Sequence, residues 1–178
     1  MVGGASLVLA ACGSSPRAAS SSTSTPPVAS APTTTSTSPR ASSQTSSTGP
    51  TPYYEVTVGQ VKGLGSVLVD GQGFTLYLFV PDRQSGSSTC YGSCAQGWPP
   101  LLLPAGVTTP VAGPGVSASL LGTTRRQDGT TEVTYDKWPL YTYVTDSQPG
   151  QATGQGVDNL GGLWYVVSPQ GRAVTTRR

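Results

Sequence analysis

Histidine is absent from this sequence of 178 residues. Its absence excludes catalytic units of the Ser-His-Asp and Cys-His type, and it also excludes zinc or haem held by histidine. Charged residues make up only 10% of the chain, and the formal net charge is +2. A nucleic-acid-binding protein usually carries a dense basic surface, which this composition does not supply. We therefore expect no nucleic-acid partner, no cofactor, no bound metal and no enzymatic activity.

Aromatic residues are missing from the first 52 positions, whereas residues 53–178 hold all of the Trp, Tyr and Phe. Residues 13–52 consist almost entirely of Ser, Thr, Pro and Ala, with Arg17 and Arg40 as the only charges. Such a segment buries too little apolar surface to offset the entropy lost on ordering. We predict a disordered tether over residues 12–52 and one folded domain over residues 53–178.

The N-terminus carries a short apolar run over residues 2–11, too short to span a bilayer. The string Leu9-Ala10-Ala11-Cys12 at its end resembles the bacterial lipobox, which implies a signal peptide over residues 1–11 and a diacylglycerol and palmitate anchor on Cys12. No basic residue precedes the run, so we expect the natural start to lie upstream of Met1. The membrane partner is then the outer face of the bacterial cytoplasmic membrane, reached through the lipid on Cys12.

The domain is expected to be mostly β, because its apolar residues alternate or cluster in short runs separated by Gly, Pro and Asp. Strands are predicted over residues 54–58, 67–69, 74–80, 131–135, 140–144 and 163–167. The intervening segment 70–73, which reads Asp-Gly-Gln-Gly, indicates a hairpin because glycine readily adopts positive φ.

An internal repeat organises the domain. Residues 76–82 and 140–146 match at a constant offset, and a Trp follows each copy at Trp98 and Trp164. In a strand, alternate side chains share a face, so the aromatic residues of each copy are expected in the core and each Asp at a strand end. We predict two β-repeats, about residues 60–103 and 116–171, packed as one sandwich- or barrel-like domain. The repeated motif consists of Tyr77, Phe79, Asp82, Tyr141, Tyr143 and Asp146.

This Tyr-x-aromatic-x-x-Asp motif occurs with a Cys90-Tyr91-Gly92-Ser93-Cys94 segment and with the strings Trp98-Pro99-Pro100 and Trp138-Pro139-Leu140-Tyr141. Together they resemble the bacterial "secreted repeat of unknown function" lipoproteins over about residues 60–171. The resemblance implies an exported lipoprotein with two similar repeats. It supplies no catalytic residues, because no biochemical role is established for that family.

Cys90 and Cys94 form an even pair in an exported domain, so a structural disulfide is the default interpretation. A redox-active dithiol is the first alternative, although the spacing is not Cys-x-x-Cys and no basic residue lies nearby in the sequence. A copper site is the second alternative. Such sites generally recruit His or Met as well, and the only methionine is Met1.

Asp82 and Asp146 are the remaining candidates for chemistry. Two carboxylates can bind a cation or act as an acid and base, whereas an Asp at a strand end more often caps the following turn. Repetition favours the turn-capping role, because a structural device is needed once in each repeat. The loop over residues 154–159 offers too few oxygen ligands for Ca²⁺ and is expected to be a turn.

The aromatic residues also permit a binding surface for glycan, peptide or an apolar ligand, with Tyr53, Tyr54 and Tyr91 expected outside the core. The sequence therefore favours a membrane-tethered, non-enzymatic binding or structural module of the cell envelope, with cell-wall glycan or another envelope protein as partner. The alternative hypothesis is an extracytoplasmic redox or electron-transfer accessory that uses Cys90 and Cys94.

Overall fold

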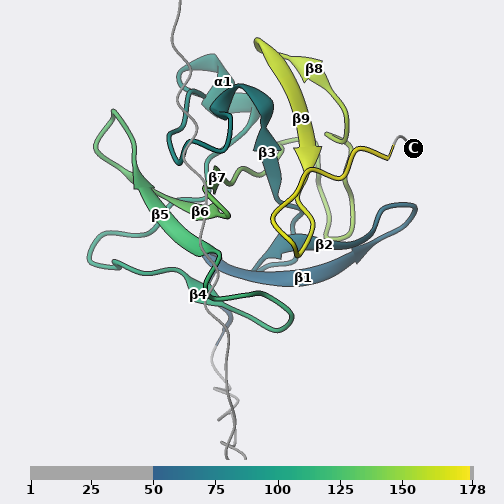
Figure 1. Cartoon of the computed structure of the whole chain (residues 1–178), viewed down its shortest axis with the longest axis horizontal. Helices are drawn as coiled ribbons and strands as arrows, with labels where there is room; N and C mark the ends of the chain where they lie inside the picture. The colour runs from purple at the N-terminus through teal and green to yellow at the C-terminus, as the bar shows by residue number, and fades with distance from the viewer. Residues whose placement is uncertain (1–49, 177–178) are drawn as a thin grey trace, which may run out of the picture. The chain divides into compact units, whose positions relative to one another are not determined.

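A computed structural model describes residues 50–176 of the chain. The signal peptide predicted over residues 1–11, the lipid anchor at Cys12 and nearly all of the tether lie outside the described residues. Within residues 50–176 no helix is both long enough and apolar enough to cross a membrane. The described part is mostly β, as the sequence predicts, and its strands form three small three-stranded sheets (Figure 1).

The first sheet contains the longest hairpin of the domain. Strand β1 (Glu55–Val61) pairs antiparallel with β2 (Gly65–Asp70), and β4 (Val111–Ala112) adds to the other edge of β1 in parallel orientation. The predicted turn after Asp70 is present, and it brings Thr75 opposite Val69 in an antiparallel bridge. Figure 1 shows this curved hairpin on the side of the domain opposite α1.

The other two sheets combine segments from both halves of the chain. Strand β3 (Tyr77–Phe79) pairs with β9 (Gly162–Val166), which also pairs with β8 (Asp158–Asn159). Strand β5 (Leu121–Arg125) pairs with β6 (Thr131–Tyr135), and β6 pairs with β7 (Trp138–Pro139). The β3–β9 pairing joins residues that lie far apart in the sequence, so neither repeat forms a closed set of strands.

Two strands are shorter than the alternation in the sequence predicts. The 74–80 segment is a regular strand only in β3, with a bridge at Thr75 and further backbone hydrogen bonds at Phe74 and Leu76, and Val80 already begins a 3-10 turn, η1 (Val80–Asp82). The 140–144 segment forms only bridges at Tyr141, to Tyr77 and to Pro100. A short helix, α1 (Ser93–Gly97), was not expected, because a five-residue helix leaves no apolar periodicity to read.

The two repeats meet at the tyrosines of their motifs. The backbone N–H of Tyr77 donates to the carbonyl oxygen of Tyr141 at 2.8 Å, and the N–H of Tyr141 donates back to Tyr77 at 3.0 Å. On one side of this contact the two tyrosines lie in a cluster with both of the repeated Trp residues. On the other side Leu76, Leu78 and Leu140 lie in a second cluster. Because successive side chains of a strand point to opposite faces, the motif residues divide between two core clusters.

A stack of four aromatic rings fills the first of these cores. Trp98 and Trp164 lie parallel at 4.0 Å between ring centroids, and both are fully buried. Phe79 stacks on the outer face of Trp164 at 4.1 Å, and Tyr143 stacks on the outer face of Trp98 at 3.9 Å. Each strand aromatic therefore stacks on the Trp of the other repeat. Stacked rings of this size contribute stability beyond their buried area.

Gly154 permits the closest approach to this stack. A Cβ atom at this position would lie 2.5 Å from the Trp98 ring, a separation that side chains do not tolerate. The ring of Trp98 is also fixed by its Nε1–H, which donates to Oδ1 of Asn159 at 3.1 Å. The segment 154–159 is predicted from the sequence to be a turn but ends in strand β8 at Asp158–Asn159, and it packs against the indole through Gly154 and Asn159.

Candidate functional site

The repeated tyrosines and aspartates bind each other across the repeats. The hydroxyl of Tyr77 donates to Oδ2 of Asp146 at 2.5 Å, and the hydroxyl of Tyr141 donates to Oδ2 of Asp82 at 2.8 Å. All four side chains are buried, with no more than 6% of any of them exposed. The motif of one repeat is therefore completed only by the motif of the other.

The second oxygen of each aspartate holds the loop that follows its own motif. Oδ1 of Asp82 accepts from the backbone N–H of Thr89 at 2.8 Å and from its hydroxyl at 2.6 Å. Oδ1 of Asp146 accepts the same two bonds from Thr153, at 2.7 and 2.6 Å. Both carboxylates are thus occupied by internal donors. No hydrogen bond between described residues joins Asp82 to Asp146; each carboxylate binds a tyrosine and a threonine instead.

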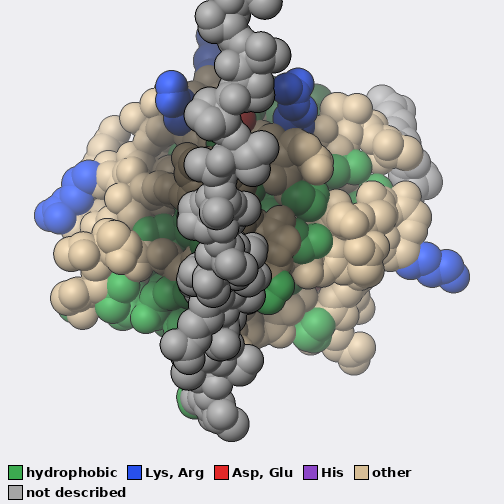
Figure 2. Space-filling model, turned by 60° about the horizontal axis from the view of Figure 1, so that its bottom comes forward, with side chains coloured by type: hydrophobic (Ala, Val, Ile, Leu, Met, Phe, Trp, Pro, Cys, Tyr) green, Lys and Arg blue, Asp and Glu red, His purple; other side chains and the backbone are tan. Residues whose placement is uncertain are grey.

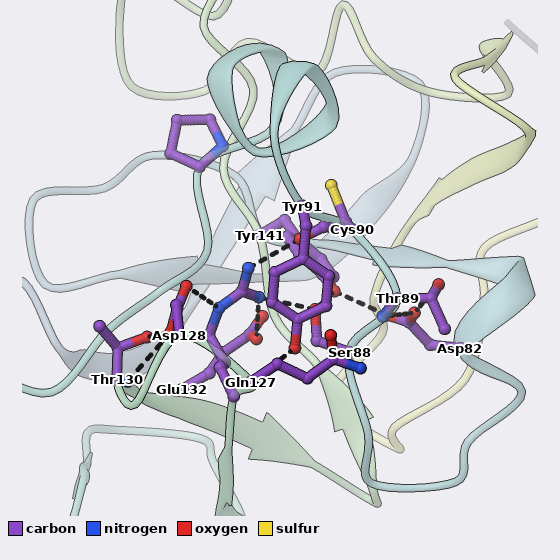
Figure 3. Close-up of polar contacts among 12 residues, drawn as sticks. Asp82, Ser88, Thr89, Cys90, Tyr91, Gln127, Asp128, Thr130, Glu132 and Tyr141 are labelled. Carbon is purple, nitrogen blue, oxygen red and sulfur yellow. Dashed lines mark hydrogen bonds and ion pairs between the residues drawn. The ribbon is translucent and has the colours of Figure 1, made fainter.

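Only one of the two Tyr–Asp pairs continues into a larger polar network. The hydroxyl of Tyr141 also lies 2.7 Å from Oγ of Ser88, and Nη1 of Arg126 donates to that same Oγ at 2.6 Å. Nη1 also reaches Oε2 of Glu132 at 2.7 Å. In the other repeat Ala152 stands at the position that corresponds to Ser88, and the hydroxyl of Tyr77 accepts a hydrogen bond from the backbone N–H of Gly154 at 3.3 Å. Figure 3 shows this network between Asp82 and Glu132.

Glu132 is the most unusual member of this network. Its side chain is fully buried, and Oε1 has no hydrogen-bond partner among the described residues. Burial raises the pKa of Glu132 from its ordinary value of 4.5 to about 8, against the opposing charge of Arg126. Burial also raises the pKa of Asp82, against its hydrogen bonds from Thr89 and Tyr141. Protons are therefore held more tightly here than in water.

The Cys pair adjoins the network. Cys90 and Cys94 are joined by a disulfide, and both belong to the buried cluster that contains Trp98. Nη2 of Arg126 donates to the carbonyl oxygen of Cys90 at 2.7 Å, and the guanidinium lies 4.4 Å from the centre of the Tyr91 ring. The fold thus supplies the cation that the sequence around the Cys pair lacks.

Sequence reasoning missed Ser88, Arg126 and Glu132. The pair Arg125-Arg126 reads as an exposed basic cluster, yet Arg126 is only 3% exposed. One feature of the sequence indicates the Arg126–Glu132 pair. The segment 126–130 forms a tight turn in which Arg126 and Thr130 are hydrogen-bonded, so the hairpin carries Arg126 and Glu132 to the same neighbourhood. In the sequence, Arg126 and Glu132 flank Asp128-Gly129, a typical turn dipeptide, and this placement is the signal that indicates the pair.

The prediction that Tyr53, Tyr54 and Tyr91 lie outside the core is wrong for Tyr54, which packs against the second cluster. Tyr53 is 41% exposed, whereas Tyr54 and Tyr91 are half-buried. The hydroxyl of Tyr91 accepts a hydrogen bond from the backbone N–H of Gln127 at 3.0 Å. Residues 50–176 contain no group of three or more Cys, Asp or Glu side chains placed to hold a metal ion. Among these three tyrosines Tyr53 has the most exposed side chain.

Comparison with known proteins identifies the repeats. The family model described as "Secreted repeat of unknown function" matches twice, over residues 61–102 and 122–168. The two matches contain one Tyr–Asp motif each. No curated protein and no solved structure matches the chain.

Replacing Glu132 tests the buried acid through the pH dependence of stability. The folded protein holds a proton on Glu132 that the unfolded chain releases from about pH 4.5 upward. Its contribution is therefore complete below pH 4.5 and is lost as the pH rises to about 8, with a slope of at most about 1.4 kcal/mol per pH unit. Urea unfolding between pH 4.5 and 8.5 should show a shallower decline for Glu132→Gln than for the parent.

Glu55→Gln serves as the matched control, because Glu55 lies half-buried at the start of β1 and outside the network. This variant should keep the slope of the parent protein. A Glu132→Gln protein whose stability declines as steeply as the parent's would show that Glu132 titrates normally in the fold.

Proposed function

The chain belongs to the secreted-repeat family and is a secreted protein, and from this premise we propose that it is a lipid-anchored, non-enzymatic binding or structural module of the bacterial cell envelope. Its expected partners are cell-wall glycan or another envelope protein. The tether over residues 12–52 would hold the domain at a distance from the membrane, with an r.m.s. span of about 35 Å for a flexible chain.

The proposal rests on one observation: the polar side chains of the repeated motif all form hydrogen bonds with other groups of the protein. A catalytic acid or base must reach a proton of its substrate. Asp82 and Asp146 each accept three hydrogen bonds from the protein itself, and the tyrosines that bind them are fully buried. These groups support the fold and leave the surface for binding.

The surface supports a partner that is not strongly acidic. Figure 2 shows the face over β1 and β4, where the Lys and Arg side chains stand apart at the rim and hydrophobic side chains gather between them. Nucleic acid requires several neighbouring cations along its backbone. The separated basic residues of this face do not offer that spacing.

A redox role for the Cys pair is the second candidate function, and one contact favours it. The guanidinium of Arg126 binds the carbonyl group of Cys90 and lies beside Tyr91. A neighbouring cation lowers the pKa of a cysteine thiol and so favours the reactive thiolate. The burial of both sulfur-bearing residues opposes this role, because a thiol–disulfide exchange partner must reach a sulfur atom.

The reduction potential of the Cys90–Cys94 disulfide distinguishes these two functions. For a structural disulfide we expect a value below about −300 mV when the full chain is equilibrated with thiol buffers and analysed by mass spectrometry. Reduction should also lower the unfolding midpoint in urea, because the disulfide packs within the cluster of Trp98. A value between about −230 and −120 mV, with the fold intact in both states, would establish the redox alternative.

Lipid attachment at Cys12 is tested separately. The gene, expressed in a bacterium with a basic segment ahead of residue 1, should yield a product that incorporates labelled palmitate and partitions into detergent. Cys12→Ser should abolish both properties, because its hydroxyl does not replace the thiol that receives the diacylglycerol. Ser14→Ala, two residues away, should retain them. Palmitate label that persists in Cys12→Ser would contradict the proposed anchor.

A further inference from the structure

A groove of about 470 Å³ lies where the domain begins, apart from the buried network. Its walls come from the turn that follows β2 and from the segments around residues 100 and 142. Tyr53 stands at its edge, and Pro100, Leu101 and Leu102 contribute apolar surface. Asp70 is the only charged side chain in its lining. The volume falls within the range of small-ligand sites.

Asp70 brings a negative charge that no basic side chain offsets. Its side chain is at the end of β2 and the residue is only 5% exposed. The two hydrogen bonds that its carboxylate accepts, from the backbone N–H groups of Gln72 and Phe74, both end on Oδ1 at 2.9 Å. None of the ion pairs within residues 50–176 includes Asp70. Asp70 itself lines the groove, so its carboxylate is the charged group that a ligand there would meet.

The charge of Asp70 is poorly solvated in this position. Burial raises the pKa of Asp70, and the neighbouring backbone N–H groups only partly oppose it. A cation that enters the groove would restore the interaction with the carboxylate that water provides elsewhere.

Tyr53 is held at the groove by a glycine. The backbone N–H of Gly71 donates to the carbonyl oxygen of Tyr53 at 3.4 Å, and a Cβ atom on Gly71 would lie 2.0 Å from the carbonyl oxygen of Pro52. Only glycine allows the entering chain to pass so close to the turn. The ring of Tyr53 packs edge-on against Tyr54, with 5.5 Å between the ring centroids.

We propose that this groove binds an aliphatic primary ammonium group, such as that of a lysine side chain. Oδ2 of Asp70 would accept a charge-assisted hydrogen bond, the ring of Tyr53 would face the cation, and Leu101, Leu102 and Pro100 would pack against the methylene groups. This inference rests on the proposed binding function, because it specifies the chemistry of the partner. The argument for a monovalent organic cation is charge complementarity, because the groove combines one buried carboxylate with apolar wall residues.

The test uses two-dimensional NMR of the full chain with Cys12→Ser, which prevents lipidation. Pentylammonium represents a free amine, Nα-acetyl-lysine N-methylamide represents a peptide-borne lysine, and pentanol is the neutral control. We expect saturable shifts of the Leu101 and Leu102 resonances with one or both ammonium probes and much weaker binding of pentanol. Binding of the lysine probe alone would point to a protein partner, and binding of both would point to amines in general.

Asp70→Asn is the decisive variant, because its side-chain oxygen keeps the two turn hydrogen bonds while the charge is lost. It should raise the dissociation constant about tenfold or more. Asp158→Asn, an exposed acid in the lining of a different groove, should not change it. Tyr53→Ala, at an exposed position, should weaken binding independently of the turn.

Several results would overturn the proposed site. These are the absence of saturable shifts, equal binding of pentanol, or equal binding by the parent, Asp70→Asn and Tyr53→Ala proteins. Failure of the ammonium site can be told apart from failure of the proposed function. The reduction potential of Cys90–Cys94 is measured without any ligand, and a value in the range of thiol oxidoreductases would favour the redox alternative. A structural disulfide with no ammonium binding would leave a binding or structural module whose partner has another chemistry.

Discussion

Each repeat of this domain completes its polar core with a group from the other repeat. A buried tyrosine hydroxyl needs an acceptor, and a buried aspartate needs donors. Tyr77 finds its acceptor in Asp146, and Tyr141 finds its acceptor in Asp82. The aromatic stack is shared in the same way, because Phe79 and Tyr143 each pack on the Trp of the opposite repeat. One repeat alone would leave both kinds of group without a partner.

The two repeats differ in the polar contacts that surround their Tyr–Asp pairs. The Asp82 side extends through Ser88 and Arg126 to the buried Glu132 and to the carbonyl group of Cys90, whereas the Asp146 side does not. The network thereby links the disulfide segment to β6. The groove around Asp70 lies elsewhere, in the part of the domain that the entering chain reaches first. The buried network and the proposed ammonium groove thus lie in different parts of one small fold.

The sequence predicts the mostly β class, the two repeats and the aromatic core, because alternation and the constant offset are visible in one chain. The strand predicted over residues 131–135 coincides with β6. The sequence cannot show that Tyr141 binds Asp82, because an internal repeat identifies which residues correspond but does not show which residues are in contact. It also hides Arg126 and Glu132, since charged residues on a short hairpin usually face water. Burial of this pair depends on contacts from segments that are distant in sequence.

Separation of the two repeats tests the account most directly. The chain can be divided between Ala105 and Gly106, two exposed residues that lie between the motifs. If the repeats complete each other, residues 1–105 and 106–178 will each lack a cooperative unfolding transition, measured by tryptophan fluorescence in urea. An equimolar mixture will recover a single cooperative transition. Cooperative unfolding of either fragment alone, with Trp98 or Trp164 buried, would contradict the claim that the exchanged Tyr–Asp and aromatic contacts hold the fold together.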